Sequence, residues 1–184
     1  MQYTNLPVGS EGGGSEGGGA GGVLCARPCD NGVMQDDVLE TLVREQMLFT
    51  RFVLHGVAPK DRDVPLDRSA VILLSRLQAQ GEMTVAELAE AFDLDVSTIH
   101  RQTAAAMKAG LLERIADPDG GVARKLRPTD EGKRRLSAEL EARKTGFGRV
   151  LDDWSDEEAQ DFVKYLQRYN EAVERRRGKS WPRD

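Results

Sequence analysis

The sequence has few of the residues on which most catalytic and metal sites depend. Its 184 residues include two cysteines and two histidines, and aromatic residues make up 5% of the chain. Cys25 and Cys29 are too few for a four-thiolate zinc site, and a reducing cytosol disfavours a structural disulfide between them. His55 and His100 lie on different predicted helices, and neither has a neighbouring set of residues for nucleophilic or metal chemistry. We therefore expect no enzymatic activity, no bound metal and no cofactor.

Long apolar runs are also missing from the sequence. No apolar stretch approaches the roughly 20 residues that a membrane span needs, and no N-terminal stretch has the pattern of a secretory signal. We therefore expect a cytoplasmic protein without a membrane partner. A chain of 184 residues has room for one compact domain with a sizeable core, together with shorter appendages.

The negative charge of the chain is unevenly distributed. The whole chain carries a formal charge of −5, yet residues 96–135 contain nine Lys and Arg side chains against five acids. The stretch before it, residues 82–95, has five acids and no Lys or Arg. Phosphate affinity depends on the local face rather than on the charge of the whole chain. A nucleic-acid partner therefore remains compatible with the sequence.

Residues 1–33 have the composition of a flexible tail. Ten of the nineteen glycines lie in this segment, and the run SEGGG occurs twice, at residues 10–14 and 15–19. Such a segment buries too little apolar surface to offset the entropy lost on ordering it. Two origins fit this composition: an added linker, or translation from a start upstream of a true start at Met34.

Two amphipathic helices are predicted before the central part of the chain. Apolar residues recur at three- and four-residue spacing over residues 35–56, as on one face of a helix. That face is wider than a lone helix needs, so we expect it to be buried on two sides. Residues 66–80 should form a second helix, with Asp67 near its start and Gly81 at its end.

Two further helices are predicted toward the C-terminus. Thr129 should cap a long helix over residues 129–151, because the acids that follow it suit the positive end of a helix. Gly146 and Gly148 each cost roughly 1 kcal/mol relative to alanine inside a helix, which predicts a bend or an early end there. Ser155 with Glu158 forms a capping box that opens the last helix.

Residues 83–110 have the pattern of two short helices joined by a tight turn. Thr84 followed by Glu87 is a capping-box pair at the start of the first helix. After a short acidic break, Asp95 is placed to cap the second helix. This second helix is small and polar at its start and should end at Gly110, a natural residue for a helix C-terminus.

A β-hairpin is predicted after the second of these helices. Residues 111–115 and 122–127 are compatible with strands, and the sequence DPDGG between them is typical of a turn. A helix, a tight turn, a second helix and a hairpin are together typical of a winged helix-turn-helix domain. In such a domain the second helix enters the major groove of DNA.

The order of these elements resembles the MarR family of bacterial transcriptional regulators. Three segments carry the resemblance, which covers roughly residues 35–177: MTVAELAEAFDLDVSTIHRQTAAAMKAGLLER, DPDGGVARKLRPTDEG and WSDEEAQDFVKYL. It implies a mainly α fold with a small β-hairpin wing, in which a winged helix-turn-helix is joined to a helical dimerisation lobe. The domain would span residues 34–178, with dimerisation helices at residues 35–57, 129–151 and 155–177 and a frayed C-terminus at residues 179–184.

The resemblance also implies which residues read DNA. The family's base-reading positions correspond to Ser97, Thr98, His100 and Arg101, with Gln102 as a further candidate. Arginine can donate two hydrogen bonds to a guanine edge, and serine or threonine can contact bases or phosphate. Simpler roles stay open, since Ser97 and Thr98 also suit the first turn of any helix and Arg101 could be a solvated surface charge.

The predicted wing departs from the family pattern. Members commonly carry arginine near the tip of the hairpin, where this chain has Gly121 and Val122. Arg124 and Lys125 come a few residues later, on the predicted strand, where successive side chains point to opposite faces. We therefore expect Arg124 and Lys125 to hold phosphate rather than to insert into the minor groove.

The resemblance implies a homodimer that binds a pseudo-palindromic operator in double-stranded DNA. Such a protein would be a repressor that a small ligand relieves, although no set of residues identifies the effector. One alternative is a winged-helix protein-interaction module without DNA binding, because the arginines at the hairpin tip are missing. A second alternative is a thiol-based redox-responsive regulator, because Cys25 and Cys29 precede the first predicted helix.

Overall fold

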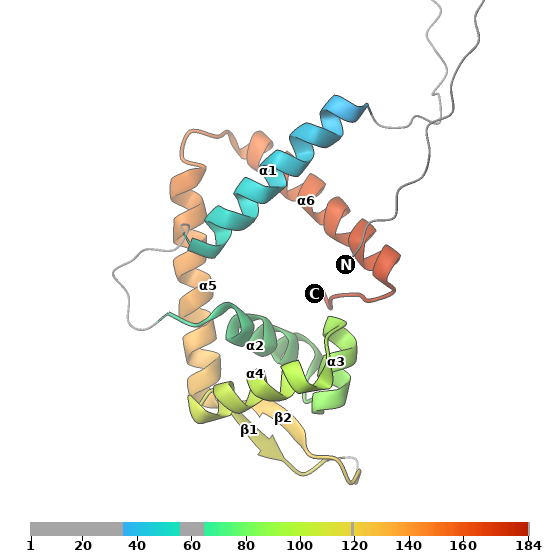
Figure 1. Ribbon diagram of the computed structural model, residues 1–184. Coiled ribbons are helices and arrows are strands. Elements are labelled where there is room, and N and C mark those ends of the chain that lie inside the picture. The colour runs from blue at the N-terminus through green and yellow to red at the C-terminus, as the bar shows by residue number, and fades with distance from the viewer. Residues whose placement is uncertain (1–34, 56–64, 119, 184) are drawn as a thin grey trace, which may run out of the picture. The chain divides into compact units, whose positions relative to one another are not determined.

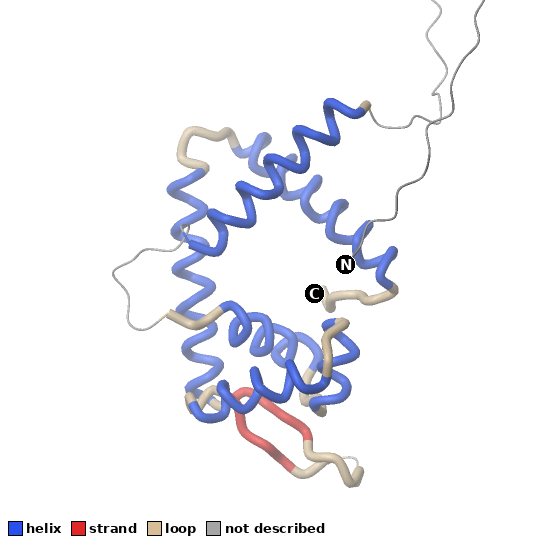
Figure 2. The backbone as a smooth tube through the Cα atoms, viewed as in Figure 1, coloured by secondary structure: helices blue, strands red, loops and turns tan. Residues whose placement is uncertain are grey.

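The computed structural model describes residues 35–55, 65–118 and 120–183. In this part of the chain six helices accompany one two-stranded antiparallel sheet (Figures 1 and 2). The helices are α1 (Asp36–His55), α2 (Arg68–Gln80), α3 (Val85–Phe92), α4 (Val96–Lys108), α5 (Asp130–Val150) and α6 (Asp156–Arg177), and the strands are β1 (Leu112–Ile115) and β2 (Lys125–Pro128). The mainly helical fold with a small hairpin wing is confirmed. The predicted tail at residues 1–33, with Cys25 and Cys29, lies outside the described residues.

The hydrophobic core lies among α2, α3, α4, α5 and the hairpin. The buried apolar side chains of α2 are Ala70, Val71, Leu73, Leu74 and Leu77. The largest buried apolar side chains of the other elements are Leu88, Ile99, Leu126 and Leu136. Burying a side chain of this size stabilises a fold by about 1.5–3 kcal/mol. The core therefore fixes α4 and the hairpin as one unit.

The wing is tied to the beginning of α3. β1 pairs with β2 from Leu112 opposite Pro128 to Ile115 opposite Lys125. Met83 adds a bridge, because its N–H donates to the carbonyl of Leu126 at 3.2 Å and its carbonyl accepts from the N–H of Leu126 at 2.7 Å. The hairpin consequently moves with the helix-turn-helix and not as a separate arm.

The helix starts that the sequence predicts are present. In α3 the N–H of Glu87 donates to Thr84 Oγ1 at 3.1 Å, and the N–H of Thr84 donates to Glu87 Oε2 at 2.7 Å. Ser155 and Glu158 form the same reciprocal pair at the start of α6. Asp67 caps α2 by accepting from the N–H of Ala70 at 2.9 Å, and Thr129 caps α5 by accepting from the N–H of Gly132 at 3.0 Å.

The second strand is shorter than predicted. It begins at Lys125 and not at residue 122, since β1 offers partners only from Leu112 to Ile115. β1 ends shortly before Pro118, which has no N–H to donate to a ladder. Arg124 therefore precedes the strand instead of lying on it.

Two predictions about helix ends are met only in part. α5 does not end early at its glycines, but continues through Gly146 and Gly148 to Val150. Asp95 is the N-cap residue of α4, but its side chain makes no capping hydrogen bond. Only its backbone carbonyl accepts, from the N–H groups of Thr98 at 2.9 Å and Ile99 at 3.2 Å.

The dimerisation helices of the resemblance expose much of their apolar surface. The described part of α1 exposes Val38, Leu39, Leu42, Val43, Met47 and Phe49. Contacts divide the chain into two compact units between Leu42 and Val43, within α1. In the second unit the ring of Phe49 lies 6.5 Å from that of Phe162 on α6, edge to face. The predicted burial of α1 on two sides is not met within a single chain.

The end of the chain differs from the frayed C-terminus that the sequence predicts. In residues 179–183 the side chains of Arg183 and Trp181 both contact other elements of the fold. Arg183 Nη1 donates to Glu174 Oε2 at 2.7 Å, and the ring of Trp181 stacks on that of Phe92, with centroids 6.1 Å apart. The basic residues of this end predict fraying, and the sequence pattern does not predict the aromatic contact of Trp181 that holds it.

Candidate nucleic-acid interface

One face of α4 anchors the helix in the core. Ile99 and Thr103 are fully buried and Ala106 is 4% exposed, and this four- and three-residue spacing defines a single inward stripe. The buried hydroxyl of Thr103 has a hydrogen-bond partner, because it donates to the carbonyl of Ile99 at 2.9 Å. The orientation of α4 about its own axis is therefore set by its buried residues.

The opposite face of α4 carries the residues predicted to read DNA. Ser97, His100 and Arg101 are exposed, while Thr98 and Gln102 are half-buried at the edges of the face. All five predicted residues on α4 thus lie outside the core, on the first two turns of one helix. Farther along this exposed side lie Ala104 and Lys108. A small residue such as alanine there lets a helix approach a groove closely.

The turn between α3 and α4 fixes how the two helices meet. Asp93 has a left-handed backbone with φ of 55°, and it has the only positive φ outside glycine among the described residues. Aspartate tolerates this conformation because its short polar side chain can bond locally. The N–H of Asp93 donates to the carbonyl of Glu90 at 3.2 Å, and that of Leu94 donates to the carbonyl of Ala89 at 3.0 Å. These bonds end α3 within one residue and allow α4 to start at once.

The end of α4 is equally well defined. Gly110 has φ of 72°, its N–H donates to Met107, and the N–H of Leu111 donates to Ala106, both at 2.9 Å. This pair of bonds is a Schellman motif, which needs a left-handed residue after the helix. The hydroxyl of Thr129 donates to the carbonyl of Gly110 at 2.6 Å, so the start of α5 braces the same turn.

In the wing, the two predicted phosphate contacts have different surroundings. Lys125 Nζ lies 2.8 Å from Asp117 Oδ1, and both side chains are mostly buried, with 16% and 14% of their surface exposed. The ammonium of Lys125 is therefore used to hold the base of the hairpin turn together. Arg124 lies in the exposed stretch before β2. Of the two, Arg124 is the better placed for a phosphate.

Arg114 is not among the residues that the sequence predicts to contact DNA. The strand register makes it a further candidate. Arg114 lies opposite Leu126, and side chains of directly opposed residues share one face of a hairpin. Leu112, two residues earlier, is on that same face and is buried, whereas Arg114 is exposed. Arg114 thus projects at the edge of the face that packs on the core. Only the pairing register, which one sequence does not give, distinguishes it from the other arginines of the wing.

The other face of the hairpin holds an internal ion pair. Arg127 Nε lies 2.8 Å from Glu113 Oε1 on the opposing strand. The hydrogen bond that Arg127 donates to this carboxylate raises the pKa of Arg127. Because both side chains are about half exposed, the pair contributes little to stability. It does reduce the positive charge that Arg127 offers to a phosphate.

The geometry suits a binding surface. The described parts of the chain hold no group of three His, Cys, Asp or Glu side chains that could bind a metal. In the same parts, no helix is both long enough and apolar enough to span a bilayer. What the site offers is a short rigid helix with a guanidinium, an imidazole and hydroxyls on its outer face, next to a basic hairpin. These are the groups that hydrogen-bond to base edges and phosphates.

Comparison with known proteins agrees with this geometry. The sequence profile of the MarR family matches residues 64–121. YxaD, an uncharacterized HTH-type transcriptional regulator of Bacillus subtilis (strain 168), is 35% identical over 134 residues, which cover 73% of this chain and 94% of YxaD.

Solved structures share the fold. A MarR family protein from Bacillus stearothermophilus superposes with a TM-score of 0.63 at 24% identity, over 77% of this chain and 99% of the other. The regulator PcaV from Streptomyces coelicolor, solved with its natural ligand, gives a TM-score of 0.53 at 20% identity, over 77% of this chain and 99% of PcaV. The family consists of transcriptional regulators and not of enzymes. From its similarity to YxaD and the family match across α2 to the wing, the chain belongs to the MarR family of DNA-binding, helix-turn-helix transcriptional regulators.

Proposed function

We propose that the chain binds a pseudo-palindromic operator as a homodimer, with α4 of each protomer in the major groove, and that it represses transcription until a small ligand releases it. The observation that carries the proposal is the division of α4 into two faces. Ile99 and Thr103 hold the helix in the core, whereas Arg101 and its exposed neighbours take no part in that packing. A helix presented in this way matches the groove-reading helix of winged helix-turn-helix domains.

The exposed surfaces of α1 and α6 support a dimer. None of the 22 residues of α6 is buried, and Val163, Tyr165 and Tyr169 each expose more than half of their surface. A helix with this much exposed apolar surface is unusual unless another element covers it. A second copy of the chain would cover it and would present two recognition helices to DNA.

Repression is carried over from the family resemblance, and control by a ligand from a solved structure with the same fold. PcaV was solved in complex with its natural ligand, and we carry ligand control to this chain on the basis of the shared fold. Control by thiol oxidation has less support, because Cys25 and Cys29 lie outside the described residues.

Selection of bound sequences from a random duplex pool tests this proposal. We expect an enriched inverted repeat whose half-sites are about one helical turn, roughly 10–10.5 base pairs, apart. Light scattering of the same preparation should give the mass of a dimer, which is twice 20.3 kDa. Enrichment of a single unrepeated site by a monomer, or the lack of any enriched sequence, would contradict it.

A further inference from the structure

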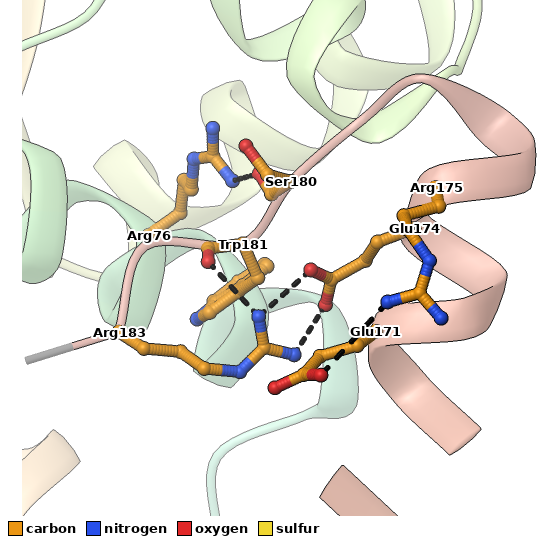
Figure 3. A network of polar contacts seen from close by, with 7 residues as sticks. All are labelled: Arg76, Glu171, Glu174, Arg175, Ser180, Trp181 and Arg183. Atoms are coloured by element: carbon orange, nitrogen blue, oxygen red, sulfur yellow. Dashed lines mark hydrogen bonds and ion pairs between the residues drawn. The ribbon is translucent and has the colours of Figure 1, made fainter. Parts of the chain in front are cut away.

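The chain turns back on itself after α6. Gly178 is the C-cap of α6 and has φ of 63°, a left-handed conformation that glycine adopts without steric cost. The N–H of Lys179 then donates to the carbonyl of Glu174 at 3.2 Å. This turn directs residues 179–183 toward α2 and α3 (Figure 3).

An indole anchors this returning segment. The ring of Trp181 stacks on Phe92, the last residue of α3, with 25° between the ring planes and 6.1 Å between the centroids. On α2, Arg76 Cζ lies 5.3 Å from the centroid of the Trp181 ring. Trp181 thus contacts two elements of the DNA-binding part at once, through stacking and a cation–π contact.

Arg76 is an unusual residue to find in the core-facing part of α2. Only 7% of its surface is exposed, and its Nε has no hydrogen-bond partner in the described structure. A buried guanidinium is costly unless it is paired, and burial lowers the pKa of Arg76. The returning segment accepts one hydrogen bond from this guanidinium, because Arg76 Nη1 donates to the carbonyl of Ser180 at 3.0 Å. The charge of Glu174 on α6 also favours the charged form of Arg76.

Two ion pairs hold the segment at its ends. Arg183 donates from Nη1 to Glu174 Oε2 at 2.7 Å and from Nη2 to Glu174 Oε1 at 2.5 Å (Figure 3). Paired hydrogen bonds of this kind fix direction as well as distance. Lys179 Nζ lies 3.4 Å from Glu90 Oε1 on α3. The segment is therefore fastened to α6 at one end and to α3 at the other.

From these contacts we infer that residues 179–183 are a C-terminal clamp, with Trp181 as its anchor, which joins the end of α6 to α2 and α3 and so positions α4 for DNA. α2 packs against α4, α5 and β2, whereas no comparable packing joins α6 to α2, α3 or α4 among the described residues. The clamp thus provides a second connection between α6 and the helix-turn-helix, in addition to the covalent path through α5.

The consequence for DNA binding rests on the proposed dimer. If α6 contributes to the dimer interface, the clamp restrains how far each helix-turn-helix can move relative to that interface. Two recognition helices must lie one helical turn of DNA apart to occupy both half-sites. Releasing the clamp should therefore weaken binding to a complete operator without changing how one helix-turn-helix contacts one half-site.

The anchor can be followed by fluorescence without DNA. The chain has two tryptophans, and Trp154→Phe leaves Trp181 as the only one. We expect the emission of Trp181 to be partly shielded from acrylamide in this protein. In the double variant with Arg183→Ala we expect quenching to approach that of a free indole. Arg177→Ala, at an exposed position near the end of α6, is the matched control and should change nothing. Equal quenching with and without Arg183 would overturn the clamp.

DNA binding tests what the clamp does. With Trp181→Ala we expect the affinity for a two-half-site operator to fall by about tenfold, within the range usual for coupling between sites, and the affinity for a single half-site to stay the same. Trp181→Phe should retain most of the affinity, because a ring can still stack on Phe92. Equal losses on both DNAs, or no loss on the two-half-site operator with Trp181→Ala, would overturn the positioning role. A wild-type chain that binds no operator would instead contradict the proposed function, and the quenching experiment would still test the clamp.

Discussion

A Cβ atom at Gly132 would overlap the carbonyl oxygen of Leu111, and it would also lie 3.2 Å from Cδ2 of Leu74. α5 therefore crosses the turn after α4 at a distance that only glycine permits. The N–H of Thr129 donates to that same carbonyl at 3.0 Å. The junction between the helix-turn-helix and α5 consequently depends on glycine at position 132, because any side chain there would overlap the backbone of Leu111.

Gly132→Ala should destabilise the fold even though alanine is the better helix former. The overlap is with backbone, which cannot move aside cheaply, and overpacking of this kind costs about 1–3 kcal/mol. Gly148→Ala, in the same helix, is the control, because a Cβ there meets nothing within 4 Å and should stabilise by up to about 1 kcal/mol. Urea unfolding at one fixed protein concentration measures both. Similar stabilities for the two variants would show that the close approach has no energetic importance.

Sequence patterns predicted the helices because local chemistry determines where they begin. The Thr84–Glu87 and Ser155–Glu158 pairs place the starts of α3 and α6 at the predicted residues. The family resemblance, and not the spacing of neighbouring residues, implied the outward position of Arg101, which is exposed in the structure.

The features that the sequence did not predict depend on partners that only the folded chain brings together. Lys125 looked like a phosphate contact, but the folded wing brings Asp117 within 2.8 Å of it. Trp181 looked like part of a frayed end, but it finds Arg76, over a hundred residues earlier in the chain. No local pattern marks such partners, because only the tertiary fold brings them together.

Arg124 and Lys125 should differ in their effect on DNA binding although they are neighbours. Arg124→Ala should weaken binding similarly for all sequences and reduce the salt dependence by about one phosphate contact. Lys125→Ala should leave the salt dependence nearly unchanged, because its ammonium already pairs with Asp117. Affinities measured over a series of salt concentrations separate the two. The reverse order of effects would mean that the Lys125 pair opens on DNA.

The pKa of Glu174 should report on the C-terminal clamp. Hydrogen bonds from Arg183 hold the pKa of this carboxyl below its usual range, and the charge of Arg76 on α2 acts in the same direction. A carboxyl group whose pKa is lower in the folded state than in the unfolded state stabilises the fold at pH values above the ordinary glutamate pKa of about 4.3. This stabilisation is lost as the pH falls through the lowered pKa. Arg183→Ala should therefore raise the pKa of Glu174, as measured by carboxyl NMR titration.

A neighbouring pair provides the control for that titration. Arg175 contacts Glu171 at 3.9 Å on the same helix, so Arg175→Ala should leave the pKa of Glu174 nearly unchanged. A pKa of Glu174 that is insensitive to Arg183, or equally sensitive to both substitutions, would exclude the specific pairing.

We propose that Arg101 on α4 reads a base within each half-site. The most direct measurement is the affinity of the wild-type chain and of Arg101→Ala for the selected operator, with each base pair substituted in turn. Arg68→Ala, at an exposed position at the start of α2, is the control for loss of a positive charge. We predict that Arg101→Ala loses about 1–3 kcal/mol and relaxes specificity at one symmetric position in each half-site. Unchanged affinity, or a loss equal at every base pair and matched by Arg68→Ala, would contradict the account.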